Sequence, residues 1–279
     1  MSIRCLVIIL LSLPSLLLTI SCNDDPYVTK IIESRLPIPK ADWQSPVAQL
    51  YRDKIKHLSS LGSWIAPHDC DSLLFNGIAR AAGIESIDLS LAEHEPNVLH
   101  RRPYDPCWLD GEDRGSKSTI SNDMIVGWVL GQHAAGNAGK IKEYYERARR
   151  DHWIIGKPIS VIGRVVLKPN LQAVLRLAFG SDKPGAVVFF PVKADYERHL
   201  QALLIEFVSR VNGGYTENML DMLEGLREDD DKDALFFAAS DMREAAADRL
   251  LSGYIPSYIR GSDEYPHIYQ AYVARLILK

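Results

Sequence analysis

Apolar positions recur at helical spacing along most of the chain beyond residue 44. The stretches with this pattern run over 45–61, 71–83, 120–135, 140–152, 195–211, 216–228, 233–251 and 267–278. In most of them apolar side chains return about every three to four residues, which places them on one face of a helix, whereas 120–135 is apolar almost throughout. Short glycine turns separate several of these stretches. The pattern predicts a mainly α fold of antiparallel helical hairpins, packed as a bundle or as an incomplete (α/α) toroid.

Two segments lack this pattern. Residues 93–117 contain prolines, glycines and charged residues with little periodicity, so we expect a long loop. Long ordered loops in compact domains are often functional. Residues 159–167 are rich in β-branched side chains and predict either a short strand or a buried connection.

The first residues predict an export signal. Arg4 precedes an apolar run over residues 5–18, which is long enough for a signal but short for a bilayer span. Ser21 and Cys22 follow this run and resemble the lipobox of bacterial lipoproteins, although Thr19 stands where leucine is usual. The resemblance implies that Cys22 is lipidated. A secretory signal cut nearby and an uncleaved anchor are the alternatives.

These features divide the chain into three parts. Residues 1–21 form the predicted signal peptide, 22–43 a proline-containing tether, and 44–279 a single helical domain. A lipid on Cys22 would tether the domain to a membrane of the cell envelope, facing the periplasm or the exterior. Secretion is the alternative localisation.

Composition narrows the class of protein. With 47% hydrophobic and 24% charged residues, the chain is neither disordered nor collagen-like. Its net charge of −4 argues against an unspecific nucleic-acid binder, which would carry a basic excess. We therefore expect no nucleic-acid partner.

The cysteines fit export. Cys5 lies in the signal and Cys22 would carry lipid, which leaves Cys70 and Cys107. Two remaining thiols in an oxidising compartment predict a disulfide. A catalytic thiol beside a histidine such as His68 or His100 is the competing interpretation, but neither cysteine has a context typical of cysteine hydrolases.

Other common chemistries lack their motifs. The two cysteines and scattered histidines show no zinc spacing, so no metal is expected. The chain has no phosphate-binding loop, dinucleotide fingerprint or serine-hydrolase elbow, so no cofactor is expected either.

Carboxylates are the best candidates for chemistry. Asp69 or Asp71 starts the predicted helix that ends at Gly83, and Asp123 lies in the first turns of the next long helix. If the predicted disulfide holds the first helix near the loop, one of the first two aspartates can face Asp123 across a cleft. Such a pair suits glycosidic hydrolysis, with one acid and one base or nucleophile. Helix capping and ion pairing are the alternative roles.

Several neighbouring polar residues are candidates for substrate contacts. Arg101 and Arg102 can hold a carboxylate or phosphate group, or pair with acidic residues of their own loop. Trp128 and Tyr145 can line a sugar-binding groove, but their helical spacing favours the core. The substrate-binding candidates are His68, His100, Arg101, Arg102, Ser121 and Asn122.

Three motifs resemble a bacterial and phage family without assigned function. They are Asp69–Gly77, His100–Pro103 with Cys107, and Ser118–Met124 with Gly127, and the similarity extends to the helix over 196–204. Asn122 stands where the family carries arginine, a difference that would weaken catalysis if the arginine takes part. The Asp-Met-x-x-Gly pattern is remotely similar to helix pairs of (α/α) toroid glycosidases and polysaccharide lyases. That similarity concerns the fold alone.

Two classes of function remain. One is a cell-envelope enzyme, a glycoside hydrolase or lyase acting on a glycan. The other is a non-catalytic envelope lipoprotein that binds a protein or polysaccharide partner. An enzyme predicts that the polar residues between His68 and Asp123 converge on a concave site, whereas a binding module predicts that they disperse as caps.

Overall fold

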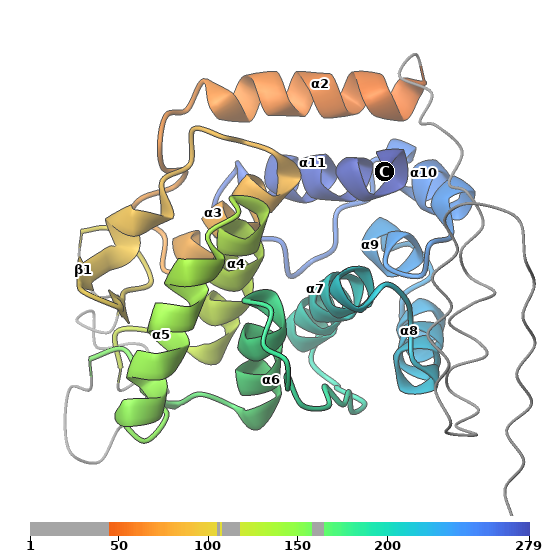
Figure 1. Cartoon of the computed structure of the whole chain (residues 1–279). Helices are drawn as coiled ribbons and strands as arrows, with labels where there is room; N and C mark the ends of the chain where they lie inside the picture. Colours follow the sequence, from red (N-terminus) through yellow and green to blue (C-terminus); the bar gives the residue numbers. More distant parts are fainter. Residues whose placement is uncertain (1–44, 105–106, 108–117, 158–164) are drawn as a thin grey trace, which may run out of the picture.

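The computed structural model describes residues 45–104, 107, 118–157 and 165–279, and these residues are mainly helical (Figure 1). This confirms the predicted fold class. The helices are α2 (Pro46–Ser59), α3 (Ser72–Ala82), α4 (Asn122–Ala134), α5 (Ala138–Arg150), α6 (Pro169–Ala178), α7 (Asp195–Asn212), α8 (Glu217–Asp229), α9 (Ala234–Ala238), α10 (Arg243–Leu251) and α11 (Tyr265–Leu278).

The strands are short. β1 (Glu93–Glu95) pairs antiparallel with β2 (Val98–Leu99), and β3 (Ile154–Ile155) pairs antiparallel with β4 (Val165–Val166). A 3-10 turn, η1, spans Leu89–Ala92. The first hairpin occupies part of the segment expected to be a long loop, and β4 corresponds to the strand alternative for residues 159–167.

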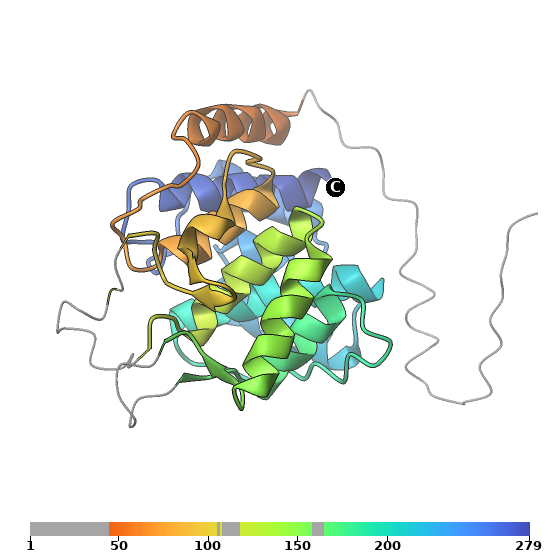
Figure 2. The same ribbon diagram turned by 60° about the vertical axis from the view of Figure 1, so that its left-hand side comes forward.

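Five helices form an inner ring. α3 packs on α4, α4 on α7, α7 on α9, α9 on α11, and α11 returns to α3. The other helices cover this ring from outside: α2 lies on α11, α5 and α6 on α4, α8 on α7 and α9, and α10 on α9 and α11. Both views show α2 along one side of the molecule, over α11 (Figure 1, Figure 2).

α11 and α3 run parallel. At their starts, the Tyr265 hydroxyl donates to Asp69, just ahead of α3. At their ends, Arg275 Nη1 donates to the carbonyl of Ala81 at 2.8 Å. α7 and α4 also run parallel, because Asp123 interacts with Tyr196 at their starts and the rings of His133 and Phe207 lie 5.1 Å apart near their ends.

Glycines bring α3 and α4 into backbone contact. A Cβ on Gly77 would lie 1.9 Å from the carbonyl oxygen of Gly127, and a Cβ on Gly127 would lie 2.2 Å from that of Leu74. No side chain fits between the helices at this crossing, which explains a glycine in both motifs. Leu74 lies against Gly127 and Gly77 lies against Gly131, so the contacts follow the same order along α3 and α4. These two helices are therefore parallel too. The N-terminal ends of α3, α4, α7 and α11 therefore gather at one end of the molecule.

The predicted disulfide is present. Cys70, immediately before the N-cap of α3, is bonded to Cys107, with the Cα atoms 5.5 Å apart. The link ties the start of α3 to the segment that follows β2.

Apolar residues from all the helices form one buried cluster. Trp128 and Tyr145 belong to it, at 1% and 8% exposure, which confirms the core interpretation over a sugar-binding groove. No helix in the described part of the chain is long and apolar enough to cross a membrane. The predicted signal and tether, including Cys22, lie outside the described residues.

The predicted helices differ from the structure in two places. The single helix expected over 233–251 is divided into α9 and α10, because Asp241 adopts a left-handed conformation with φ of 57°. α6 was not expected, although Pro169 at its first turn is a typical helix start.

Candidate carboxylate site at the starts of the inner helices

Asp69 joins the start of α11 to the start of α3. Its Oδ1 accepts hydrogen bonds from the Tyr265 hydroxyl at 2.6 Å and from the backbone N–H of Asp71 at 2.8 Å. Burial, followed by the hydrogen bond to Asp69, raises the pKa of Tyr265 well above its ordinary value, so this tyrosine stays a hydrogen-bond donor. Because the Tyr265 hydroxyl and the Asp71 backbone N–H both donate to this oxygen, Asp69 fixes the start of α11 relative to the backbone ahead of α3.

Asp71 occupies the N-cap position of α3 but does not cap the helix through its side chain. The backbone N–H of Leu73 instead donates to the carbonyl of Arg101 at 2.9 Å. The carboxylate of Asp71 pairs with Arg101 Nη2 at 3.1 Å and is about half exposed, at 48%. The capping role considered from the sequence therefore does not account for Asp71.

The surroundings of Asp71 favour its protonated form. Burial by neighbouring groups is the largest cause that raises its pKa, and the carboxylates of Asp123 and Asp69 add to it, while Arg101 opposes the shift. A carboxyl group with a raised pKa keeps its proton to higher pH, as a general acid requires.

Asp123 lies in the first turn of α4 and is half-buried. Within the described residues it makes no hydrogen bond, and it interacts electrostatically with Asp71 and with Tyr196 of α7. The free N–H groups at the start of a helix favour a negative charge. The N-cap residue Ser121 makes no capping bond, and its buried Oγ has no partner in this part of the structure.

The two arginines hold the segment that carries Asp69 and Asp71. Arg101 is buried and donates through Nε to the carbonyl of Cys70 at 3.1 Å, besides pairing with Asp71. Arg102 Nη1 donates to the carbonyl of His68 at 2.5 Å. Both therefore lie next to the carboxylates, where they orient the chain.

Two other predicted substrate-binding residues, His68 and His100, have different surroundings in the structure. His68 is exposed, with its ring 6.0 Å from that of Tyr104. His100 is buried and stacks on His94 at 3.8 Å, and burial followed by the charge of His94 lowers its pKa to about 4. The structure therefore places His100 against the β1–β2 hairpin.

Asn122 is engaged elsewhere. Its Nδ2 donates to the carbonyl of Val166 at 3.1 Å, and its Oδ1 accepts from the backbone N–H of Lys168 at 3.0 Å. Since both polar atoms hold β4 and the start of α6, Asn122 has a structural task at the edge of the site.

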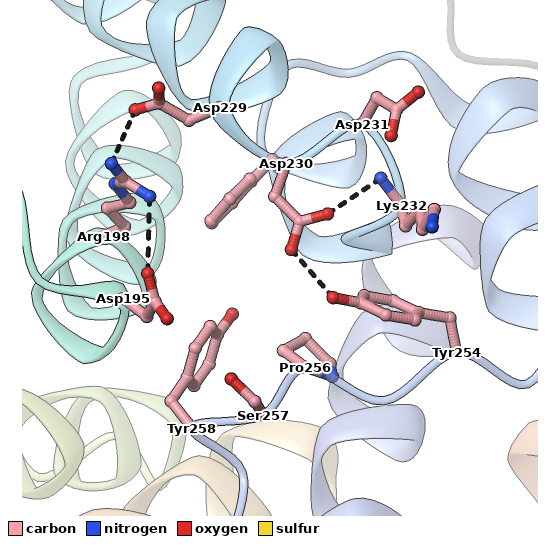
Figure 3. A pocket seen from close by; sticks show the side chains of 11 residues that line it. Asp195, Arg198, Asp229, Asp230, Asp231, Lys232, Tyr254, Pro256, Ser257 and Tyr258 are labelled. Carbon is pink, nitrogen blue, oxygen red and sulfur yellow. Dashed lines mark hydrogen bonds and ion pairs between the residues drawn. The ribbon is translucent and has the colours of Figure 1, made fainter.

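A pocket of about 390 Å³ opens at the same end of the ring (Figure 3). Arg198 of α7 pairs there with Asp195 at 3.4 Å and with Asp229 at 3.1 Å. Asp230 accepts from the Tyr254 hydroxyl at 3.0 Å and from the backbone N–H of Lys232 at 3.0 Å. Tyr196, which interacts electrostatically with Asp123, follows the pocket residue Asp195 in the sequence.

The sequence analysis did not single out this pocket, although the acidic run over 229–231 is visible in the sequence. Only the fold brings it opposite the start of α7 and residues 254–258.

A buried polar cluster lies behind the pocket wall. Asp233 caps α9 and accepts hydrogen bonds from the hydroxyls of Tyr258 and Tyr269, while burial raises its pKa to about 6. The ring of His199 lies 4.9 Å from that of Tyr258, and burial lowers the pKa of His199 to about 3, so it is neutral. These residues join α7, α9 and α11 behind the site.

Among the described residues, His57, Glu264 and His267 are grouped closely enough to hold a metal ion.

Comparison with protein-family models, curated proteins and solved structures gives no match.

Proposed function

We propose that this protein is an exported cell-envelope lipoprotein that hydrolyses a glycan with Asp71 and Asp123. The observation that carries the proposal is that the two carboxylates stand at the starts of parallel helices that are in backbone contact. Neither carboxylate caps its helix, and the charge of Asp123 is among the causes that raise the pKa of Asp71. The close crossing at Gly77 and Gly127 keeps the two helix starts together.

The two acids have different roles. Protonated Asp71 donates its proton to the glycosidic oxygen as the bond to the anomeric carbon breaks. Asp123 takes a proton from the water whose oxygen bonds to that carbon, or attacks the carbon itself before water releases the sugar. Arg101 holds Asp71 in place, and Asp69 with Tyr265 holds the backbone beneath it.

The rim of the site supports a sugar as substrate. Tyr104 and Tyr196 are 64% and 54% exposed, and they lie beside His68 and Asp123, respectively. Flat aromatic faces in water offer apolar area against which a sugar ring can stack, with hydroxyl groups free to bond at the edges. The unpartnered Oγ of Ser121 is a further candidate contact.

The test is the release of reducing ends from envelope polysaccharides, peptidoglycan included, by the full chain. Asp71→Asn and Asp123→Asn should each lower the rate about 10²–10⁴-fold, the usual contribution of a general acid or base. Asp221→Asn, an exposed aspartate on α8, is the matched control and should keep full activity. Glycan binding without hydrolysis by the unmodified protein would favour the non-catalytic lipoprotein instead.

A further inference from the structure

His57, Glu264 and His267 meet where the last turn of α2 lies against the start of α11. His57 Nε2 is 2.7 Å from Glu264 Oε2, and the two imidazole rings are 4.9 Å apart in an edge-on arrangement. One ligand atom from each residue can be chosen so that all lie within 4.8 Å of one another. Ligand atoms around a tetrahedral zinc ion are about 3.4 Å apart, because each bond measures about 2.1 Å. Small side-chain rotations would therefore close this group around one ion.

We propose that His57, Glu264 and His267 bind a divalent transition metal ion, with Zn²⁺ as the best match. Two imidazoles and one carboxylate form a ligand set that suits zinc, whereas calcium and magnesium prefer oxygen ligands alone. Three protein ligands leave one position of a tetrahedral ion for water. The site does not depend on the proposed glycan hydrolysis.

The carboxylate and the first imidazole are accessible. The side chains of His57 and Glu264 are 43% and 27% exposed, so an ion can reach them from solvent. Glu264 occupies the N-cap position of α11 but makes no capping hydrogen bond through its side chain. Its carboxylate can therefore bind an ion without removing a cap from the helix.

Lys54 competes for the third ligand. Its Nζ lies 2.6 Å from His267 Nδ1, where the ammonium donates to a lone pair that a metal ion can use. Lys54 is half-buried and has a long flexible side chain, so it can leave when an ion arrives. Removing the ammonium group should therefore strengthen metal binding.

The experiment is calorimetric titration of the oxidised full chain with Zn²⁺, together with absorption spectra of the Co²⁺ form. We expect saturable binding of one ion by this site, with a cobalt spectrum that lacks a thiolate charge-transfer band. His57→Ala and His267→Ala should each weaken binding about tenfold or more, and Glu264→Gln should weaken it as well. Lys54→Met should bind more tightly than the unmodified chain.

His152→Asn is the matched control, because His152 is exposed in a turn outside the group and asparagine tolerates its left-handed backbone. This variant should bind Zn²⁺ as the parent does. Zinc should also raise the unfolding temperature of the parent and not of His57→Ala, because the ion joins α2 to α11. Equal affinity in the parent and in both histidine variants, no binding at all, or loss of binding in Lys54→Met would overturn the assignment.

Discussion

At the scale of single residues, the two catalytic candidates differ from structural aspartates because neither of them caps its helix. Asp71 and Asp123 stand at helix starts, where an aspartate commonly caps exposed N–H groups, yet neither is used in that way. Asp233, by contrast, is buried, caps α9 and accepts two tyrosine hydroxyls, as a structural aspartate does. The sequence alone offers no means to tell these aspartates apart, because each of them lies at the start of an apolar helix.

This difference predicts a stability effect with a defined sign. The raised pKa of Asp71 means that its ionised form is disfavoured in the folded state, so the stability associated with the protonated group is lost as pH rises through that pKa. Asp71→Asn should therefore unfold at the same or a higher temperature at neutral pH. The difference from the parent should narrow as pH falls through the pKa of Asp71.

Thr216→Ala is the reference for a true cap, since the Thr216 hydroxyl accepts from the backbone N–H of Met219. It should lose about 1 kcal/mol of unfolding free energy. Thermal unfolding followed by circular dichroism at several pH values measures both variants. A loss in Asp71→Asn as large as that in Thr216→Ala would restore the capping explanation.

At the scale of elements, the contact between α3 and α4 positions the site. Both helices carry a carboxylate at the start and a glycine farther along, and the glycines allow backbone contact at the crossing. The disulfide from Cys70 then fixes the segment ahead of α3. The motifs contained these residues, but their spacing along the chain gave no information on the crossing.

Gly127→Ala should strongly destabilise the protein. Its new methyl group would lie 2.2 Å from the backbone oxygen of Leu74, so the helices would have to separate, at a cost of about 3 kcal/mol or more. Gly139→Ala is the matched control, because Gly139 lies in α5 with nothing near its Cβ position. That change should be neutral or stabilise the protein by about 0.5–1 kcal/mol. Urea denaturation compares the two, and equal effects would argue against the close crossing.

At the scale of the whole molecule, the parallel inner helices place several functional features at one end. The proposed catalytic pair and two of the three proposed metal ligands, Glu264 and His267, lie at the beginnings of inner helices, and the pocket lies at the start of α7, whereas His57 comes from the last turn of α2. The pocket is lined by residues of α7, α8, α9 and the segment before α11, so it adds polar groups outside the stretch from His68 to Asp123.

A lipid on Cys22 would attach the protein to a membrane and so determine where in the cell the proposed site acts. Labelling cells with a radioactive fatty acid should mark the full chain, and Cys22→Ser should abolish the label and release the protein from the membrane fraction. Cys107→Ser keeps Cys22 and should retain the label, which separates lipidation from disulfide loss. A labelled Cys22→Ser chain would contradict the lipobox assignment.

Periodicity and composition predicted the mainly helical class, most helix ranges and the Cys70–Cys107 disulfide, because they report local preferences, and they pointed to three aspartates as candidates for chemistry. The same patterns did not predict α6. They also predicted one helix where α9 and α10 are separated by Asp241 in a left-handed conformation. The tertiary structure alone decided which distant residues meet. His57 and Glu264 are 207 positions apart, and Asp69 and Tyr265 are 196 apart. Such contacts follow from how whole helices pack, which no local pattern specifies.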